Sequence, residues 1–134
     1  MPSTLKRSVL VILLTMATLM VTLTARAEVC ATDDTGKEIC LPAPAQRIAA
    51  LSPGATELVW SAGAGDQVVA VVAFSDYPPA AGDVTSVGSH TRLDLEKLVS
   101  LKPDLVIGWV TGNPQEQIRS LDKLGLPVFS IEPR

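Results

Sequence analysis

The sequence predicts an α/β domain with a parallel sheet and helices on both faces, preceded by a β-hairpin. Four short apolar runs typical of buried parallel strands occur from Arg47 onward, at residues 48–51, 68–72, 105–107 and 127–131. Segments with helical spacing of apolar residues separate these runs, and this alternation is typical of a sheet with right-handed crossovers. A proline-rich segment, residues 41–45, sets a short two-strand pattern apart from the domain.

The first 27 residues have the pattern of a cleavable secretory signal. Lys6 and Arg7 precede an uncharged run from Ser8 to Thr24, and Ala25-Arg26-Ala27 provides small residues where a signal peptidase cuts. The alternative is a retained N-terminal anchor, although the run is shorter than the roughly 20 residues that span a bilayer. We therefore expect an exported protein whose mature chain begins at Glu28.

Removal of this signal increases the acidic excess of the chain, because eight Lys and Arg then remain against 14 Asp and Glu. An acidic protein is a poor partner for nucleic acid. The mature chain of about 107 residues suffices for one domain with its own core and is too short for two.

Residues 28–46 are expected to form a hairpin and a linker. The segments 29–31 and 38–41 can pair around Asp34-Thr35-Gly36, with Gly36 in the left-handed conformation. In that register Asp33 faces Lys37, and Cys30 faces Cys40. Export favours a disulfide between the two cysteines, which would stabilise the fold by roughly 3 kcal/mol. The alternative is a redox or metal site, but the chain has no CxxC spacing, and we expect no metal.

The first strand–helix unit begins at Arg47. Ile48 to Leu51 form the strand, Ser52 is the expected N-cap of the helix, and Pro53 is its first residue. Residues expected to face the core from this helix, which ends at Gly63 or Gly65, are Leu58, Val59, Trp60 and Ala62.

The second half of the chain repeats this pattern after a long loop at residues 74–92. A helix is expected from Asp94 to Ser100, with Leu95, Leu98 and Val99 as its apolar stripe. After the strand at 105–107, Asn113 is the expected cap of a helix opened by Pro114, with Glu116 at the capping-box position. This helix has Ile118, Leu121 and Leu124 at helical spacing and Gly125 as its stop, and Phe129 is the expected buried residue of the last strand.

Aromatic residues follow the strand ends, where ligands bind in parallel α/β sheets. Phe74 and Tyr77 come after the second strand, and Trp109 comes after the third. Rigid aromatic faces suit a large, flat and partly apolar ligand. No nucleophile–base pairing, glycine-rich phosphate loop or metal cluster is recognisable in the sequence, so we expect a binding protein without catalytic residues or cofactors.

Four local motifs carry a resemblance to a known family. They are Leu51-Ser52-Pro53, Thr56-Glu57-Leu58, Ser75-Asp76-Tyr77-Pro78 and the segment from Leu101 to Val106. In this order and spacing they resemble the first lobe of the periplasmic ABC-transporter substrate-binding proteins that capture cobalamin, ferric siderophores or haem, and the cobalamin binders in particular. The resemblance implies that residues 47–134 are an N-terminal lobe and that the second lobe is absent.

The same resemblance implies four ligand-contacting residues, Phe74, Tyr77, His90 and Trp109. For Phe74 the alternative is a core position, and Ser75-Asp76-Tyr77-Pro78 can serve mainly to shape its loop. His90 departs from the cobalamin-binder pattern, which often has an aromatic residue there. A histidine can stack on the ligand or ligate cobalt or haem iron, but it can equally be a solvated loop residue.

Glu96 matches the position at which the family carries an acidic residue for docking to the permease. The alternative is a first-turn carboxylate that complements the helix dipole. The resemblance therefore implies a monomeric periplasmic component of an ABC importer that captures cobalamin and delivers it to an inner-membrane permease. A ferric siderophore or haem is the alternative ligand, although Arg92 is the one basic residue expected near the ligand. A secreted interaction module without a ligand is the other alternative.

Overall fold

A computed structural model describes residues 2–18 and 27–133 of the chain. Helix α1 (Ser3–Thr18) lies within the predicted secretory signal, and none of the helices in the described residues is long and apolar enough to cross a membrane. Ala25 and Arg26, next to the expected cleavage point, lie outside the described residues. Cleavage after Ala27 therefore stays a prediction.

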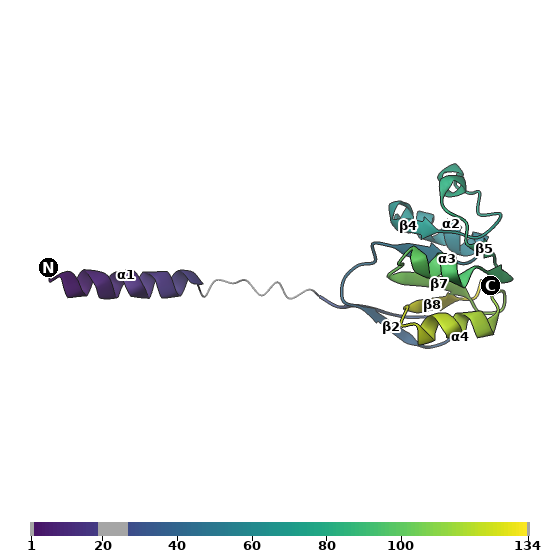
Figure 1. Ribbon diagram of the computed structural model, residues 1–134. Helices are drawn as coiled ribbons and strands as arrows, with labels where there is room; N and C mark the ends of the chain where they lie inside the picture. Colours follow the sequence, from purple (N-terminus) through teal and green to yellow (C-terminus); the bar gives the residue numbers. More distant parts are fainter. Residues whose placement is uncertain (1, 19–26, 134) are drawn as a thin grey trace.

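The main sheet has four parallel strands in the order β4-β3-β7-β8 (Figure 1). Their bounds are β3 (Ile48–Ala50), β4 (Val68–Ala70), β7 (Leu105–Trp109) and β8 (Val128–Ile131). The chain moves from β3 outward to β4 and then crosses to β7 and β8 on the other side. This order puts the ends of β3, β4 and β7 at one edge of the sheet and confirms the predicted parallel arrangement.

Helices cover both faces of this sheet, as the sequence predicts. Helix α2 (Pro53–Ser61) packs Val59 against a cluster that includes Ile48 and Val68. Helices α3 (Leu95–Ser100) and α4 (Gln115–Lys123) pack against the main core cluster. Neighbouring strand residues belong to different clusters, because successive side chains in a strand point to opposite faces.

Several helix boundaries agree with the sequence analysis. The Ser52 hydroxyl accepts a hydrogen bond from the Ala55 N–H at 3.0 Å and caps α2, whose first residue is Pro53. The Asp94 carboxylate caps α3 by accepting from the Lys97 N–H at 3.0 Å. Gly125 follows Leu124, the C-cap of α4, and has a φ of +80°, which is the left-handed geometry expected of a helix stop.

The predicted core faces are wrong at several exposed positions. Leu58, Ala62, Val99 and Leu124 are exposed, and Phe129 is only half-buried. In α2 the buried face is formed by Ala55, Thr56 and Val59. The Thr56 hydroxyl is hydrogen-bonded to the Ser52 carbonyl at 3.1 Å and to the Ser75 hydroxyl at 3.2 Å, so Thr56 is buried on a face that the sequence predicts to be apolar.

The segment predicted as a long loop contains regular structure. A 3₁₀ helix, η2 (Pro79–Asp83), is followed by a small antiparallel ribbon of β5 (Gly88–Ser89) and β6 (Arg92–Leu93). A second 3₁₀ helix, η1 (Gly65–Gln67), precedes β4. The expected strand at 68–72 is shorter than predicted, and Val71 makes an isolated parallel bridge to Ser86 beyond its end.

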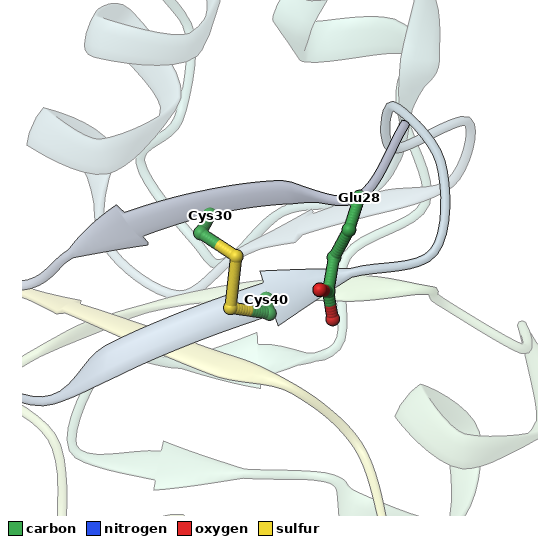
Figure 2. A group of neighbouring side chains, drawn as sticks. All are labelled: Glu28, Cys30 and Cys40. Carbon is green, nitrogen blue, oxygen red and sulfur yellow. A yellow bond between two sulfur atoms is a disulfide. The ribbon is translucent and has the colours of Figure 1, made fainter. Parts of the chain in front are cut away.

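The N-terminal hairpin consists of β1 (Val29–Thr32) and β2 (Glu38–Leu41), and Cys30 faces Cys40 as predicted. A disulfide joins the two cysteines (Figure 2). The Glu28 carboxylate lies near both sulfur atoms, so these three residues form a group with metal-ligand spacing. The metal ligand in proteins is the thiolate, however, and a disulfide-bonded sulfur is not one. This geometry favours the structural disulfide over the metal site.

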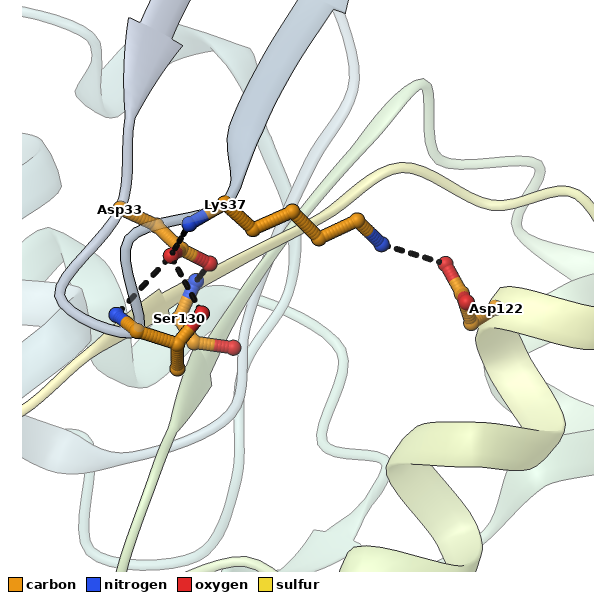
Figure 3. Close-up of polar contacts among 5 residues, drawn as sticks. Asp33, Lys37, Asp122 and Ser130 are labelled. Atoms are coloured by element: carbon orange, nitrogen blue, oxygen red, sulfur yellow. Dashed lines mark hydrogen bonds and ion pairs between the residues drawn. The ribbon is translucent and has the colours of Figure 1, made fainter.

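The turn of the hairpin docks on the edge strand β8 through Asp33 (Figure 3). Its carboxylate accepts hydrogen bonds from both the N–H and the hydroxyl of Thr35, at 2.9 and 2.6 Å, and from the Lys37 N–H at 3.0 Å. Its second oxygen accepts from the Ser130 N–H of β8 at 3.1 Å. The Lys37 ammonium also pairs with Asp122 of α4 at 3.1 Å. The hairpin therefore covers an otherwise open sheet edge.

Candidate ligand-binding site

A cavity of about 330 Å³ lies at the edge of the sheet where β3 and β7 end. Residues from five segments line it: Ser52, Pro53, Gly54, Phe74, His90, Trp109 and Pro133. Three of the four residues predicted to contact a ligand are therefore brought together. Tyr77 is not among the lining residues, and 66% of its surface is exposed.

Phe74 lies in the turn after β4 and projects into solvent. Its side chain is 83% exposed, which rules out the alternative of a core phenylalanine. Its backbone has a φ of +68°, in the left-handed region that disfavours residues with a Cβ atom by roughly 1–2 kcal/mol. The chain thus holds an exposed aromatic ring on a strained backbone at the rim of the cavity, and such strain is concentrated at functional sites.

Trp109 and His90 form the other wall of the cavity. Their ring centroids are 5.5 Å apart, and the ring planes are tilted by 38°. The Trp109 indole packs directly over the backbone of Gly112, where a Cβ atom would collide with it. Its Nε1–H is buried without a hydrogen-bond partner among the described residues. The indole is therefore fixed by packing and contributes mainly an apolar face.

His90 lies at the two-residue tip of the β5–β6 ribbon and is half-buried. The contact with Trp109 gives its imidazole a defined place at the cavity, in contrast to a fully solvated loop histidine. It is also the one ionisable side chain among the lining residues. The cavity therefore offers aromatic faces and a single imidazole, and it has no strongly charged group.

The Ser75-Asp76-Tyr77-Pro78 motif shapes the chain beside the cavity. The buried Ser75 hydroxyl accepts a hydrogen bond from Thr56 of α2, and the Tyr77–Pro78 peptide is cis. Because Ser75 is held against α2, the chain turns and Tyr77 is left outside the lining. Both Thr56 and Ser75 lie within the quoted motifs, but their pairing needs two segments 19 residues apart and is not visible in local sequence.

The expected capping role of Asn113 is wrong. Pro114 occupies the N-cap position of α4, without a side-chain hydrogen bond, and Glu116 pairs with Arg119 instead of closing a capping box. Asn113 is 4% exposed, and its carboxamide hydrogen-bonds the backbone of three other residues. An asparagine before Pro-x-Glu favours a cap by local rules, so no local pattern indicates its actual contacts.

Glu96 lies in the first turn of α3 and is exposed. Neither of the two ion pairs found in the described part of the chain includes it. It does not line the cavity, so any role it has in recognition concerns another surface.

The family model for periplasmic binding proteins matches residues 48–134. The vitamin B12-binding protein of Vibrio cholerae is 44% identical over 91 residues, which are 68% of this chain and 33% of that protein. The vitamin B12-binding protein of Yersinia pestis is 45% identical over 96 residues, which are 71% of this chain and 34% of that protein. This chain thus spans about a third of the length of the curated relatives that it matches.

Solved structures give the same result for the fold. The periplasmic vitamin B12-binding protein of Vibrio cholerae superimposes with a TM-score of 0.63 at 45% identity, over 65% of this chain and 34% of that one. A periplasmic haem-binding protein from a Roseiflexus species superimposes with a TM-score of 0.60 at 33% identity, over 65% of this chain and 33% of that one. Proteins of this fold therefore include one named for vitamin B12 and one named for haem.

Proposed function

Because this chain belongs to the periplasmic binding protein family, we propose that it carries one face of a corrinoid-binding site in an ABC importer. The observation that carries the proposal is the grouping of Phe74, His90 and Trp109 around one cavity at the strand ends. Relatives at 44–45% identity are named vitamin B12-binding proteins, which supports cobalamin as the ligand.

The geometry suits the capture of a flat, partly apolar ring. Trp109 supplies a fixed aromatic face, His90 extends that face, and exposed Phe74 stands at the rim. Burial of the ligand against these rings contributes roughly 25 cal/mol per Å² of apolar surface removed from water. A cavity of about 330 Å³ covers only part of a corrinoid, so we expect weak binding by these residues alone.

Haem is the second candidate ligand, and His90 is the observation that favours it. An imidazole is a common axial ligand of haem iron, and it also binds cobalt. The likeness to haem-binding proteins supports this alternative. A ferric siderophore has less support, because Arg92 is exposed on β6 and does not line the cavity.

The proposed organisation follows from the same family membership. Residues 1–27 direct export to the periplasm, residues 28–46 form the hairpin and linker, and residues 47–134 form the ligand-binding lobe.

Exposed Glu96 would dock this lobe to arginines of the permease. Truncation of an interfacial carboxylate can weaken association by about 2–5 kcal/mol when it leaves an arginine unpaired. Glu96→Ala should therefore weaken permease association while leaving ligand binding unchanged, and unchanged association would remove the docking role.

The experiment that tests the proposed ligand is a titration of the exported chain with cyanocobalamin, hemin and a ferric hydroxamate chelate. Chemical shifts of the Phe74, His90 and Trp109 rings report on the cavity directly. We expect saturable shifts with cyanocobalamin at concentrations up to roughly millimolar. Saturation by hemin alone would reassign the ligand, and no response to any of the three would favour the interaction module without a ligand.

A further inference from the structure

Asn113 is a buried asparagine that connects three backbone segments at the cavity. Its Oδ1 accepts a hydrogen bond from the Trp109 N–H at 2.6 Å. Its Nδ2 donates to the carbonyl oxygens of Leu51 and His90, each at 2.9 Å. One donor-only and two acceptor-only partners fit the carboxamide in this orientation alone.

All three partners belong to the cavity or adjoin it. Trp109 and His90 are lining residues, and Leu51 directly precedes the lining residue Ser52. The side-chain amide and oxygen of Asn113 therefore make all their hydrogen bonds to segments that form the walls of one cavity. Asn113 connects Leu51, which is 62 residues away in the sequence, with His90, which is 23 residues away.

The tip that carries His90 needs such a connection. The β5–β6 ribbon has only two residue pairs, Gly88 with Leu93 and Ser89 with Arg92, and so short a two-stranded ribbon is marginal by itself. Its base is held by the Gln117 carboxamide, which exchanges two 2.9 Å hydrogen bonds with the backbone of Leu93. The Asn113 side chain holds its tip, at the residue whose ring contacts Trp109.

We propose that Asn113 is a positioning residue that sets the His90 imidazole against the Trp109 indole and so builds the wall of the site. Its value for ligand capture rests on the proposed function, whereas the placement of the two rings does not. The ring contact exists without ligand and can be measured without it.

The test is Asn113→Asp in the exported chain, with nuclear magnetic resonance as the readout. Aspartate keeps the acceptor for the Trp109 N–H but replaces both donors with an oxygen that faces two carbonyls. We expect the His90 ring protons to lose the shift caused by the Trp109 ring, while the Trp109 amide stays protected from exchange. Cyanocobalamin should then bind about three- to tenfold more weakly.

Asp33→Asn is the matched control, because it also reverses a buried side chain's hydrogen-bonding character, but at the hairpin and away from the cavity lining. It should leave the His90 ring shifts unchanged. Unchanged shifts in Asn113→Asp, or equal loss in Asp33→Asn, would overturn the positioning role. Lost ring contact in Asn113→Asp together with no wild-type response to cyanocobalamin or hemin would support the positioning role and reject the ligand.

A second measurement covers the case in which Asn113→Asp does not fold. In the wild-type chain the side-chain amide protons of Asn113 should exchange slowly with water and show Overhauser contacts to both Leu51 and His90. Exchange at the rate of a solvent-exposed amide would overturn the proposal.

Discussion

At Phe74, the effect of backbone strain on stability can be measured separately from the contact with a ligand. Its φ of +68° disfavours any residue with a Cβ atom, and its ring is 83% exposed, so the ring contributes little to folding. Phe74→Gly should therefore be more stable than Phe74→Ala by about 1 kcal/mol. Urea unfolding of both variants measures this difference.

Val99 provides the control for this prediction. It is exposed on helix α3, where alanine is favoured over glycine by about 1 kcal/mol, so the order of the Ala and Gly variants should be reversed there. An alanine variant at position 74 that is more stable than the glycine variant would contradict the left-handed backbone at the rim of the cavity.

For single residues, the sequence predicts the aromatic members of the site better than the polar ones. Phe74 and Trp109 are predictable because both lie close to the end of an apolar strand, and strand ends are where ligands bind. Tyr77 lies slightly further along the same segment but falls outside the lining, because Ser75 is held against α2. The contacts of Asn113 depend on partners such as Leu51, which no local pattern specifies.

The hairpin is attached to the sheet through a titratable group, so its docking should depend on pH. Burial raises the pKa of Asp33, but the hydrogen bonds from Thr35, Ser130 and Lys37 outweigh this effect and lower the pKa below its ordinary value of 3.8. A carboxylate with a lowered folded-state pKa stabilises the fold above its unfolded pKa, and this contribution is lost as the pH falls through the folded-state pKa.

Asp33→Asn should lower the free energy of unfolding by about 2–3 kcal/mol at pH 7. The difference from wild type should shrink below about pH 4, because protonation then weakens the wild-type hydrogen bonds as well. Asp83→Asn, at an exposed position, should change the stability by less than about 0.5 kcal/mol at either pH. A difference between wild type and Asp33→Asn that stays constant down to pH 2 would contradict the role of the Asp33 carboxylate.

Elements are predicted more reliably than their faces. The order and type of the four strands and three covering helices follow from local apolar patterns, and the Cys30–Cys40 register follows from the turn at Gly36. The rotation of α2 about its axis does not follow from these patterns. Thr56 is buried by hydrogen bonds to Ser52 and Ser75, and Leu58 is exposed as a result.

Over the whole molecule, the topology brings distant segments to one edge of the sheet. The cavity combines the start of α2, Phe74 in the turn that follows β4, the tip of the β5–β6 ribbon, the end of β7 and Pro133 after β8. No two of these segments are adjacent in the sequence, yet a parallel sheet places the ends of its strands together. The fold therefore brings together the residues of the proposed ligand-binding wall, and the aromatic residues among them provide the surface for ligand contact.

The two tryptophans allow the central claim to be tested within one chain. Trp109 lines the cavity, whereas Trp60 belongs to α2, packs against the cluster that contains Val59 and is not a lining residue. The measurement is a cyanocobalamin titration, followed by nuclear magnetic resonance, of the wild type, Trp109→Ala and Trp60→Phe. We predict that Trp109→Ala abolishes the saturable shifts of the Phe74 and His90 rings and that Trp60→Phe retains them. Saturable shifts of equal affinity in Trp109→Ala would contradict the account.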